Sequence, residues 1–133
     1  MNRVISIFLC ISLLNFSFII VAAEEQEEKI DVQNPPTIME LAFLRSLGNT
    51  ILEIMENNGD NQLYTAERIE KITRNVKNDT YDIRLRVVGF HGPHNPPYKL
   101  IQMTIRIPGK YSDYDVISYK KKIISLDEFS RLK

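Results

Sequence analysis

Residues 80–107, TYDIRLRVVGFHGPHNPPYKLIQMTIRI, decide the fold because they contain two stretches in which apolar and polar side chains alternate. Residues 80–88 carry three apolar side chains opposed to charged ones, and residues 98–107 carry four apolar side chains opposed to polar ones. A period of two is typical of antiparallel strands with one buried face. The intervening residues 89–97 are rich in turn-forming residues, so we predict a long loop there.

Two further strands are predicted on either side of this pair. Residues 62–76 form a long polar and β-branched stretch, and residues 114–122 fit a fourth strand. Short turns are predicted at residues 77–79 and 108–113. Because alternate turns of a meander fall at the same end of the sheet, these two turns are expected to act together.

A helix is predicted over residues 37–55. Thr37 and Glu40 have the T-x-x-E spacing of a capping box, and apolar side chains then recur every three or four residues. Gly48 lies on this stripe, either as a tolerated small residue or because the helix closely approaches the sheet. The stripe consists of Ile38, Leu41, Leu44 or Arg45, Gly48, Ile51 or Leu52, and Met55. The fold class is therefore α+β: one long helix wrapped by four antiparallel strands, with room for a short N-terminal strand.

Residues 1–23 have the features of a secretory signal peptide. Arg3 lies in a short basic region, an apolar run follows, and Ala22 and Ala23 place small residues at the cleavage position. The alternative is an uncleaved membrane anchor, since about 18 apolar residues approach the length that spans a bilayer. Acidic residues follow at once without a basic stop-transfer cluster, which favours cleavage after Ala23. We therefore expect a secreted protein without stable membrane insertion.

The mature chain divides into an extended acidic arm, residues 24–36, and one domain, residues 37–133. The only cysteine, Cys10, lies in the signal peptide, which excludes thiol catalysis and cysteine-ligated metal in the mature protein. Removal of Arg3 leaves 16 basic residues against 17 acidic ones. Such a balance offers nucleic acid no concentrated basic face, so nucleic acid is not an expected partner.

The residue pattern also argues against an enzyme. His91 and His94 share one predicted loop and lack the third and fourth ligands of a structural zinc site. The serine residues are not surrounded by the strand-to-helix turn that presents a hydrolase nucleophile. We therefore predict that the protein is not an enzyme and uses no cofactor and no metal.

Three groups of short motifs resemble the cystatin superfamily, and the second half of the chain is most similar to the stefins. Residues 74–78, RNVKN, followed by residues 79–81, DTY, occupy the place of the family's Q-x-V-x-G hairpin. Residues 107–109, IPG, followed by residues 115–119, DVISY, resemble the stefin second hairpin. Residues 126–129, LDEF, resemble the stefin C-terminal tail.

The resemblance implies a monomeric, non-covalent inhibitor of papain-like cysteine proteases of cathepsin type. In that family the N-terminal arm and two hairpins form a wedge that fills the protease cleft. The protease-binding residues that the resemblance implies are Arg74, Asn75, Val76, Lys77, Asn78, Pro108, Gly109 and Tyr111.

The sequence departs from the family pattern in two parts of the wedge. The arm has no glycine before the helix, and the first hairpin has Arg74 in place of Gln and Asn78 in place of Gly. Asparagine tolerates a positive φ angle, so Asn78 is compatible with the turn. Asn78 also begins an N-glycosylation sequon, Asn78-Asp79-Thr80, and a glycan there would be too bulky for a protease cleft.

Two functions therefore stay open. The retained second hairpin favours a secreted cysteine-protease inhibitor that acts mainly through Pro108-Gly109 and the arm. The altered first hairpin favours a cystatin-fold binding module or secreted effector of saliva, venom or a reproductive fluid that no longer inhibits.

Overall fold

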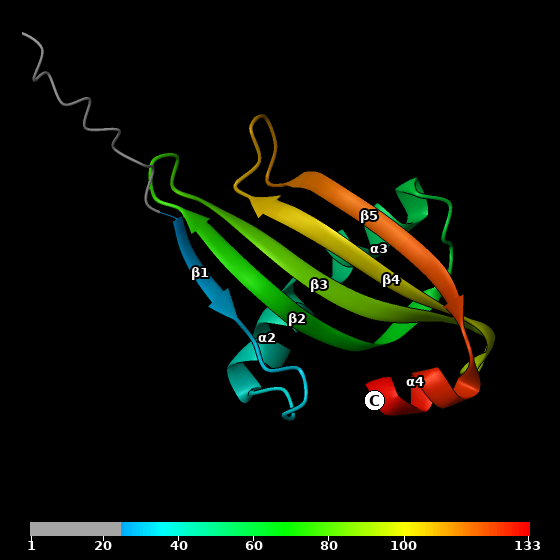
Figure 1. Ribbon diagram of the computed structural model, residues 1–133. Helices are drawn as coiled ribbons and strands as arrows, with labels where there is room; N and C mark the ends of the chain where they lie inside the picture. Colours follow the sequence, from blue (N-terminus) through cyan, green and yellow to red (C-terminus); the bar gives the residue numbers. More distant parts are fainter. Residues whose placement is uncertain (1–24) are drawn as a thin grey trace, which may run out of the picture.

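The computed structural model describes residues 25–133, which fold into the α+β arrangement predicted from the sequence. The signal peptide predicted over residues 1–23 lies outside the described residues. All five strands form one antiparallel sheet in chain order (Figure 1). The strands are β1 (Glu25–Lys29), β2 (Leu63–Asn75), β3 (Thr80–His91), β4 (Asn95–Ile107) and β5 (Asp115–Ile124). The helices are α2 (Ile38–Ser46), α3 (Gly48–Asn57) and α4 (Leu126–Leu132).

The acidic arm begins with the short strand β1 at the edge of the sheet. Glu25 lies opposite Asn75, and Lys29 lies opposite Lys71, so β1 runs antiparallel to β2. The side chain of Lys71 forms an ion pair with Glu27, and its hydrogen bond lowers the pKa of that carboxyl group. Lys71 of β2 thus offsets part of the charge repulsion within the acidic arm.

The structure has two helices where the sequence predicted one. Helix α2 begins after Thr37, whose Oγ1 accepts a hydrogen bond from the Glu40 amide at 3.1 Å, as predicted. It ends at Ser46, and α3 starts at Gly48 after the single intervening residue Leu47. A Cβ added to Gly48 would come no closer than 3.6 Å to the Tyr64 hydroxyl, so no close approach to the sheet requires glycine there. The break between α2 and α3 lies next to Gly48, which has the lowest helix propensity of the residues in this segment.

The main core lies between the sheet and these two helices. Its buried residues are Leu44, Leu47, Ile51, Ile54, Met55, Ile69, Ile83, Leu85, Val87, Ile101, Met103 and Ile105. The alternating faces of β3 and β4 are buried as predicted. The first part of the predicted helix stripe is wrong, since Ile38 is 87% exposed and Leu41 is 46% exposed. Figure 1 shows the reason: α2 lies beside β2 rather than over the centre of the sheet.

A second, smaller core lies on the other face of the sheet under α4. Val88 follows the inward-facing Val87 along β3 and therefore points to the opposite face. There it belongs to a cluster with Phe129 of α4, and the Phe129 ring stacks on Tyr98 at 4.4 Å. Ser125 caps α4 by accepting a hydrogen bond from the Glu128 amide at 3.1 Å. Helix α4 was not predicted.

The long loop predicted at residues 89–97 is wrong. Strand β3 continues to His91 and β4 starts at Asn95, which leaves a three-residue turn. The His94 ring stacks on Phe90 at 4.2 Å, and the Tyr98 hydroxyl donates to the His94 carbonyl at 2.8 Å. These contacts close the hairpin across a segment whose composition suggested irregular structure.

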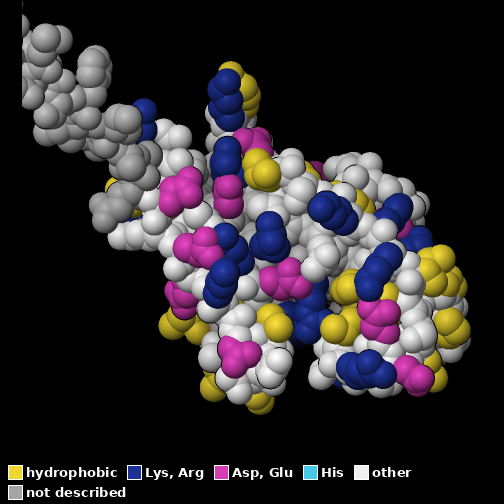
Figure 2. Space-filling view, in the orientation of Figure 1, with side chains coloured by type: hydrophobic (Ala, Val, Ile, Leu, Met, Phe, Trp, Pro, Cys, Tyr) yellow, Lys and Arg dark blue, Asp and Glu magenta, His cyan; other side chains and the backbone are white. Residues whose placement is uncertain are grey.

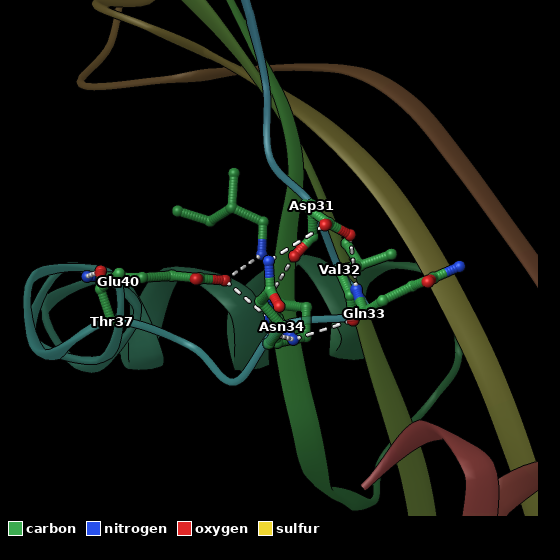
Figure 3. Close-up of polar contacts among 8 residues, drawn as sticks. Asp31, Val32, Gln33, Asn34, Thr37 and Glu40 are labelled. Atoms are coloured by element: carbon green, nitrogen blue, oxygen red, sulfur yellow. Dashed lines mark hydrogen bonds and ion pairs between the residues drawn. The ribbon is translucent and has the colours of Figure 1, made fainter.

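Two buried ionic groups fix the helices and the arm to the sheet. Arg68 donates from Nε to Glu40 Oε1 at 3.0 Å and from Nη1 to the carbonyls of Val32 and Asn34 at 3.1 and 2.8 Å. Glu40 Oε1 also accepts from the Ile69 amide at 2.9 Å. Figure 3 shows Glu40 pointing from α2 toward the segment that contains Val32 and Asn34.

The second ionic group surrounds Asp60, which is buried just after α3. Its carboxylate accepts hydrogen bonds from Lys99 Nζ at 2.8 Å, Lys121 Nζ at 2.9 Å and the Tyr119 hydroxyl at 2.7 Å. Burial alone would raise the pKa of Asp60, but these donors outweigh it and lower the pKa to about 2. Asp60 thus ties the end of α3 to β4 and β5.

Candidate functional site

Three segments from different parts of the chain meet at one end of the sheet. They are the start of β1, the β2–β3 loop of residues 76–79 and the β4–β5 loop of residues 108–114, and we call them together the loop end (Figure 1). The strand register requires this placement, because Glu25 pairs with Asn75 and Tyr81 pairs with Ile107. The expectation that the first and third turns share one end is therefore confirmed.

The β2–β3 loop is held by side chains on both of its strands. Arg74 Nη2 donates to Asp79 Oδ1 at 3.0 Å, and the Arg74 guanidinium lies 5.6 Å from the centre of the Tyr81 ring. This hydrogen bond raises the pKa of Arg74. The Asn75 side chain accepts from the Asn78 amide at 3.1 Å. The loop is therefore a closed, polar hairpin tip.

The positive φ angle in this loop falls at Asp79, with a value of 49°, and not at Asn78. The turn therefore forms without the positive φ angle that we expected at Asn78. Asn78 is exposed, as is Val76, the only apolar side chain of the loop. The Asn78 side chain is thus accessible to modification, and its glycosylation stays a prediction.

The β4–β5 loop folds back on itself and requires a glycine. A Cβ added to Gly109 would lie 2.5 Å from the Tyr114 carbonyl carbon and 2.9 Å from the Ser112 carbonyl oxygen. The Lys110 amide donates to Asp115 Oδ2 at 2.8 Å, and the Ser112 hydroxyl donates to the Tyr114 carbonyl at 2.5 Å. These bonds fix the shape of the loop at its tip, while Tyr114 at its end packs against the main core.

Tyr111 is at the tip of this loop and is 87% exposed. The ammonium group of Lys110 lies 4.9 Å from the centre of its ring. Figure 2 shows the loop as a narrow projection, with basic and hydrophobic atoms at its tip. An exposed tyrosine on a closed loop is well suited to insert into a hollow on a partner, because it offers a large contact area at a low entropic cost.

The eight sequence-predicted site residues fall into two groups at the loop end. Pro108, Gly109 and Tyr111 belong to the projecting loop, whereas Arg74 and Asn75 lie in β2 and brace the neighbouring hairpin. Sequence reasoning missed four residues that shape these loops. They are Asp79, Tyr81, Lys110 and Ser112. The opposite charges of Arg74 and Asp79 on either side of a turn could have suggested their pairing.

Within residues 25–133, no group of three or more His, Cys, Asp or Glu side chains is placed to hold a metal ion. Over the same range, every helix is too short or too polar to cross a membrane.

Comparison of the chain with known proteins gives no match. No model of a known protein family matches it, and neither a curated protein nor a solved structure does so.

Proposed function

We propose that this protein is a secreted, cystatin-like inhibitor of papain-like cysteine proteases that blocks the protease cleft non-covalently. The observation that carries the proposal is the convergence of β1, the β2–β3 loop and the β4–β5 loop at the loop end. A wedge of this family needs these three segments side by side. The order of an N-terminal strand, helical segment and four antiparallel strands also agrees with a cystatin-like fold, although the helical segment is divided here.

The β4–β5 loop is expected to supply most of the binding energy. Interfaces concentrate their energy in a few large side chains that become buried, and tyrosine is among the commonest of these. Tyr111 is the most exposed large hydrophobic side chain of the loop end, and Gly109 maintains the loop shape that presents it. Val76 offers a smaller apolar contact on the neighbouring loop. The chain contributes no reacting group in this mechanism, because it acts by occlusion of the cleft.

The proposal is tested by titrating papain and cathepsin L with the unglycosylated mature domain. Tyr111→Ala should weaken inhibition by about tenfold or more, which corresponds to the loss of about 1.4 kcal/mol or more of binding free energy. Ile123→Ala is a matched control, because Ile123 is also a strongly exposed apolar residue but pairs with Lys99, far along β4 from the loop end. The control should inhibit like the unaltered domain.

A second pair of variants separates the two hairpins. Arg74→Ala should affect inhibition far less than replacement of Pro108 and Gly109 together. Asn78→Gly removes the sequon and reduces the hairpin tip, so it should strengthen inhibition, most clearly in protein from glycosylating cells. Undetectable inhibition by every folded variant, including Asn78→Gly, would contradict the inhibitor proposal.

The alternative is a cystatin-fold binding module that does not inhibit. The first hairpin favours it, because the Arg74–Asp79 ion pair and the Tyr81 ring make that loop bulkier and more charged than the family motif. In this case the loop end would bind a partner that lacks a narrow cleft. A domain that is folded by circular dichroism and binds neither papain nor cathepsin L would support this second function.

A further inference from the structure

A groove of about 920 Å³ lies on the face of the sheet that carries α4, away from the loop end. One wall is formed by residues 32–36 and Leu41, and the other by the end of α4 with Leu132. Its floor includes Arg86 and Leu100. In Figure 2 it is the hollow between the two lower lobes, with Lys or Arg atoms visible at its base. Sequence reasoning gave no indication of it.

Arg86 in the floor of this groove forms no ion pair with any side chain of residues 25–133. Arg86 is only 6% exposed, and its Nη1 atom has no hydrogen-bond partner among residues 25–133. Burial lowers its pKa below the usual range of arginine. A buried guanidinium nitrogen without a partner is unfavourable, and a bound anion would relieve this cost.

The groups around Arg86 are already engaged with one another. Arg68 is bonded to Glu40 and to backbone carbonyls. The nearest acidic candidate, Glu70, accepts from the Gln102 side chain at 3.1 and 3.2 Å. Neither residue hydrogen-bonds to Arg86 Nη1, and the negative charges of Glu70 and Glu40 offset only part of the effect of burial on Arg86.

The groove walls indicate what else a ligand would need. They are largely apolar, with Val32, Pro35, Leu41 and Leu132 facing the hollow. A volume of up to about 1,000 Å³ with mostly apolar walls and a few polar groups is typical of small-molecule sites. The ligand should therefore have an apolar body and one polar end.

The other charged side chains that line the groove indicate which charge the polar end of the ligand should carry. Arg131 and Lys133 stand at the rim and favour an anion, whereas Glu67 and Glu70 would repel a multiply charged one. A carboxylate carries one negative charge and matches the planar guanidinium group. We propose that this groove binds a small amphipathic carboxylate, with its carboxylate on Arg86 and its apolar body between residues 32–36 and α4.

Octanoate is a suitable probe, and 1-octanol and octylammonium have the same chain with a neutral or positive end. By isothermal titration calorimetry, octanoate should bind the mature domain about tenfold or more tightly than 1-octanol, because a charge-assisted hydrogen bond contributes at least this much. Octylammonium should bind more weakly still. In amide NMR spectra, octanoate should shift residues 32–34 and 131–133 and leave residues 109–114 unchanged.

Arg86→Gln should remove the preference for octanoate over 1-octanol. Arg84→Gln is the matched control, because Arg84 lies two residues earlier on β3 and on the same face but is exposed and does not line the groove. Equal affinity for octanoate and 1-octanol, no binding of octanoate up to its solubility limit, or shifts confined to other regions would overturn the proposal. The NMR shifts of the unaltered domain provide this test even where Arg86→Gln does not fold.

Discussion

The buried carboxylate of Asp60 allows the most quantitative prediction. The three donors Lys99, Lys121 and Tyr119 lower its pKa from 3.8 to about 2. Since one pKa unit corresponds to about 1.36 kcal/mol, the ionised carboxylate contributes roughly 2.5 kcal/mol to the free energy of unfolding at neutral pH. We expect Asp60→Asn to lose about this amount, because the amide oxygen replaces only part of the hydrogen bonding and leaves two ammonium groups without a counter-charge.

The effect should depend on pH with a defined sign. The folded-state pKa lies below the unfolded value, so the stabilisation is fully present above pH 3.8 and is lost as the pH falls through about 2. The stability difference between the unaltered domain and Asp60→Asn should therefore shrink by about 2 kcal/mol between pH 6 and pH 2. Urea unfolding followed by circular dichroism at several pH values measures it.

Asp113→Asn is the control for this experiment. Asp113 is exposed in the β4–β5 loop, and its neutralisation should change stability by no more than about 0.5 kcal/mol. A difference between the unaltered domain and Asp60→Asn that stays constant from pH 6 to pH 2 would refute the assigned role of Asp60.

Three further predictions concern the core, the loop end and the helices. Ile105→Asp should lower the free energy of unfolding by several kcal/mol, because Ile105 is fully buried. Leu41→Asp should lower it by about 1 kcal/mol or less, since Leu41 is half-exposed. Equal unfolding midpoints of the two variants in urea would contradict this prediction. Gly109→Ala should cost about 1–3 kcal/mol and broaden the NMR signals of residues 108–114, because its Cβ collides with the Tyr114 backbone. Gly48→Ala should raise the thermal midpoint, since alanine favours the helix by about 1 kcal/mol and meets no clash; a lower midpoint would show that the interruption at Leu47 needs glycine.

Strands β2 to β5 could be predicted from the sequence because each of them carries a local signal, whereas β1 lies in the acidic arm and carries none. The alternation around Ile83 and Ile105 places a whole face of β3 and β4 in the core, and a shift of one residue would reverse it. The meander order then places the turns at residues 77–79 and 108–113 at one end without further information. The position of the candidate site thus followed from topology alone.

The parts that were missed depend on contacts between segments distant in the sequence. Ile38 and Leu41 fit a helical stripe, but α2 lies beside β2 and leaves them in solvent. The alternation of apolar and polar residues in β3 predicts that Arg84 and Arg86 are both exposed on the outward face. They differ only because residues 32–36 and α4 rise around Arg86, and neither segment's position is encoded near it in the chain.

The hydrogen bonds of Arg68 have a consequence for how the domain opens. One guanidinium holds residues 32–34 through backbone carbonyls, and the Glu40 carboxylate that it contacts also receives the Ile69 amide. Release of α2 from β2 would withdraw Glu40 and leave this set of contacts incomplete. Native-state hydrogen exchange should then show the first turns of α2 and the Ile69 amide sharing one opening free energy, well below that of β3 and β4. The N-terminal third of the domain would behave as a separate unit of local unfolding that is closed by a single arginine.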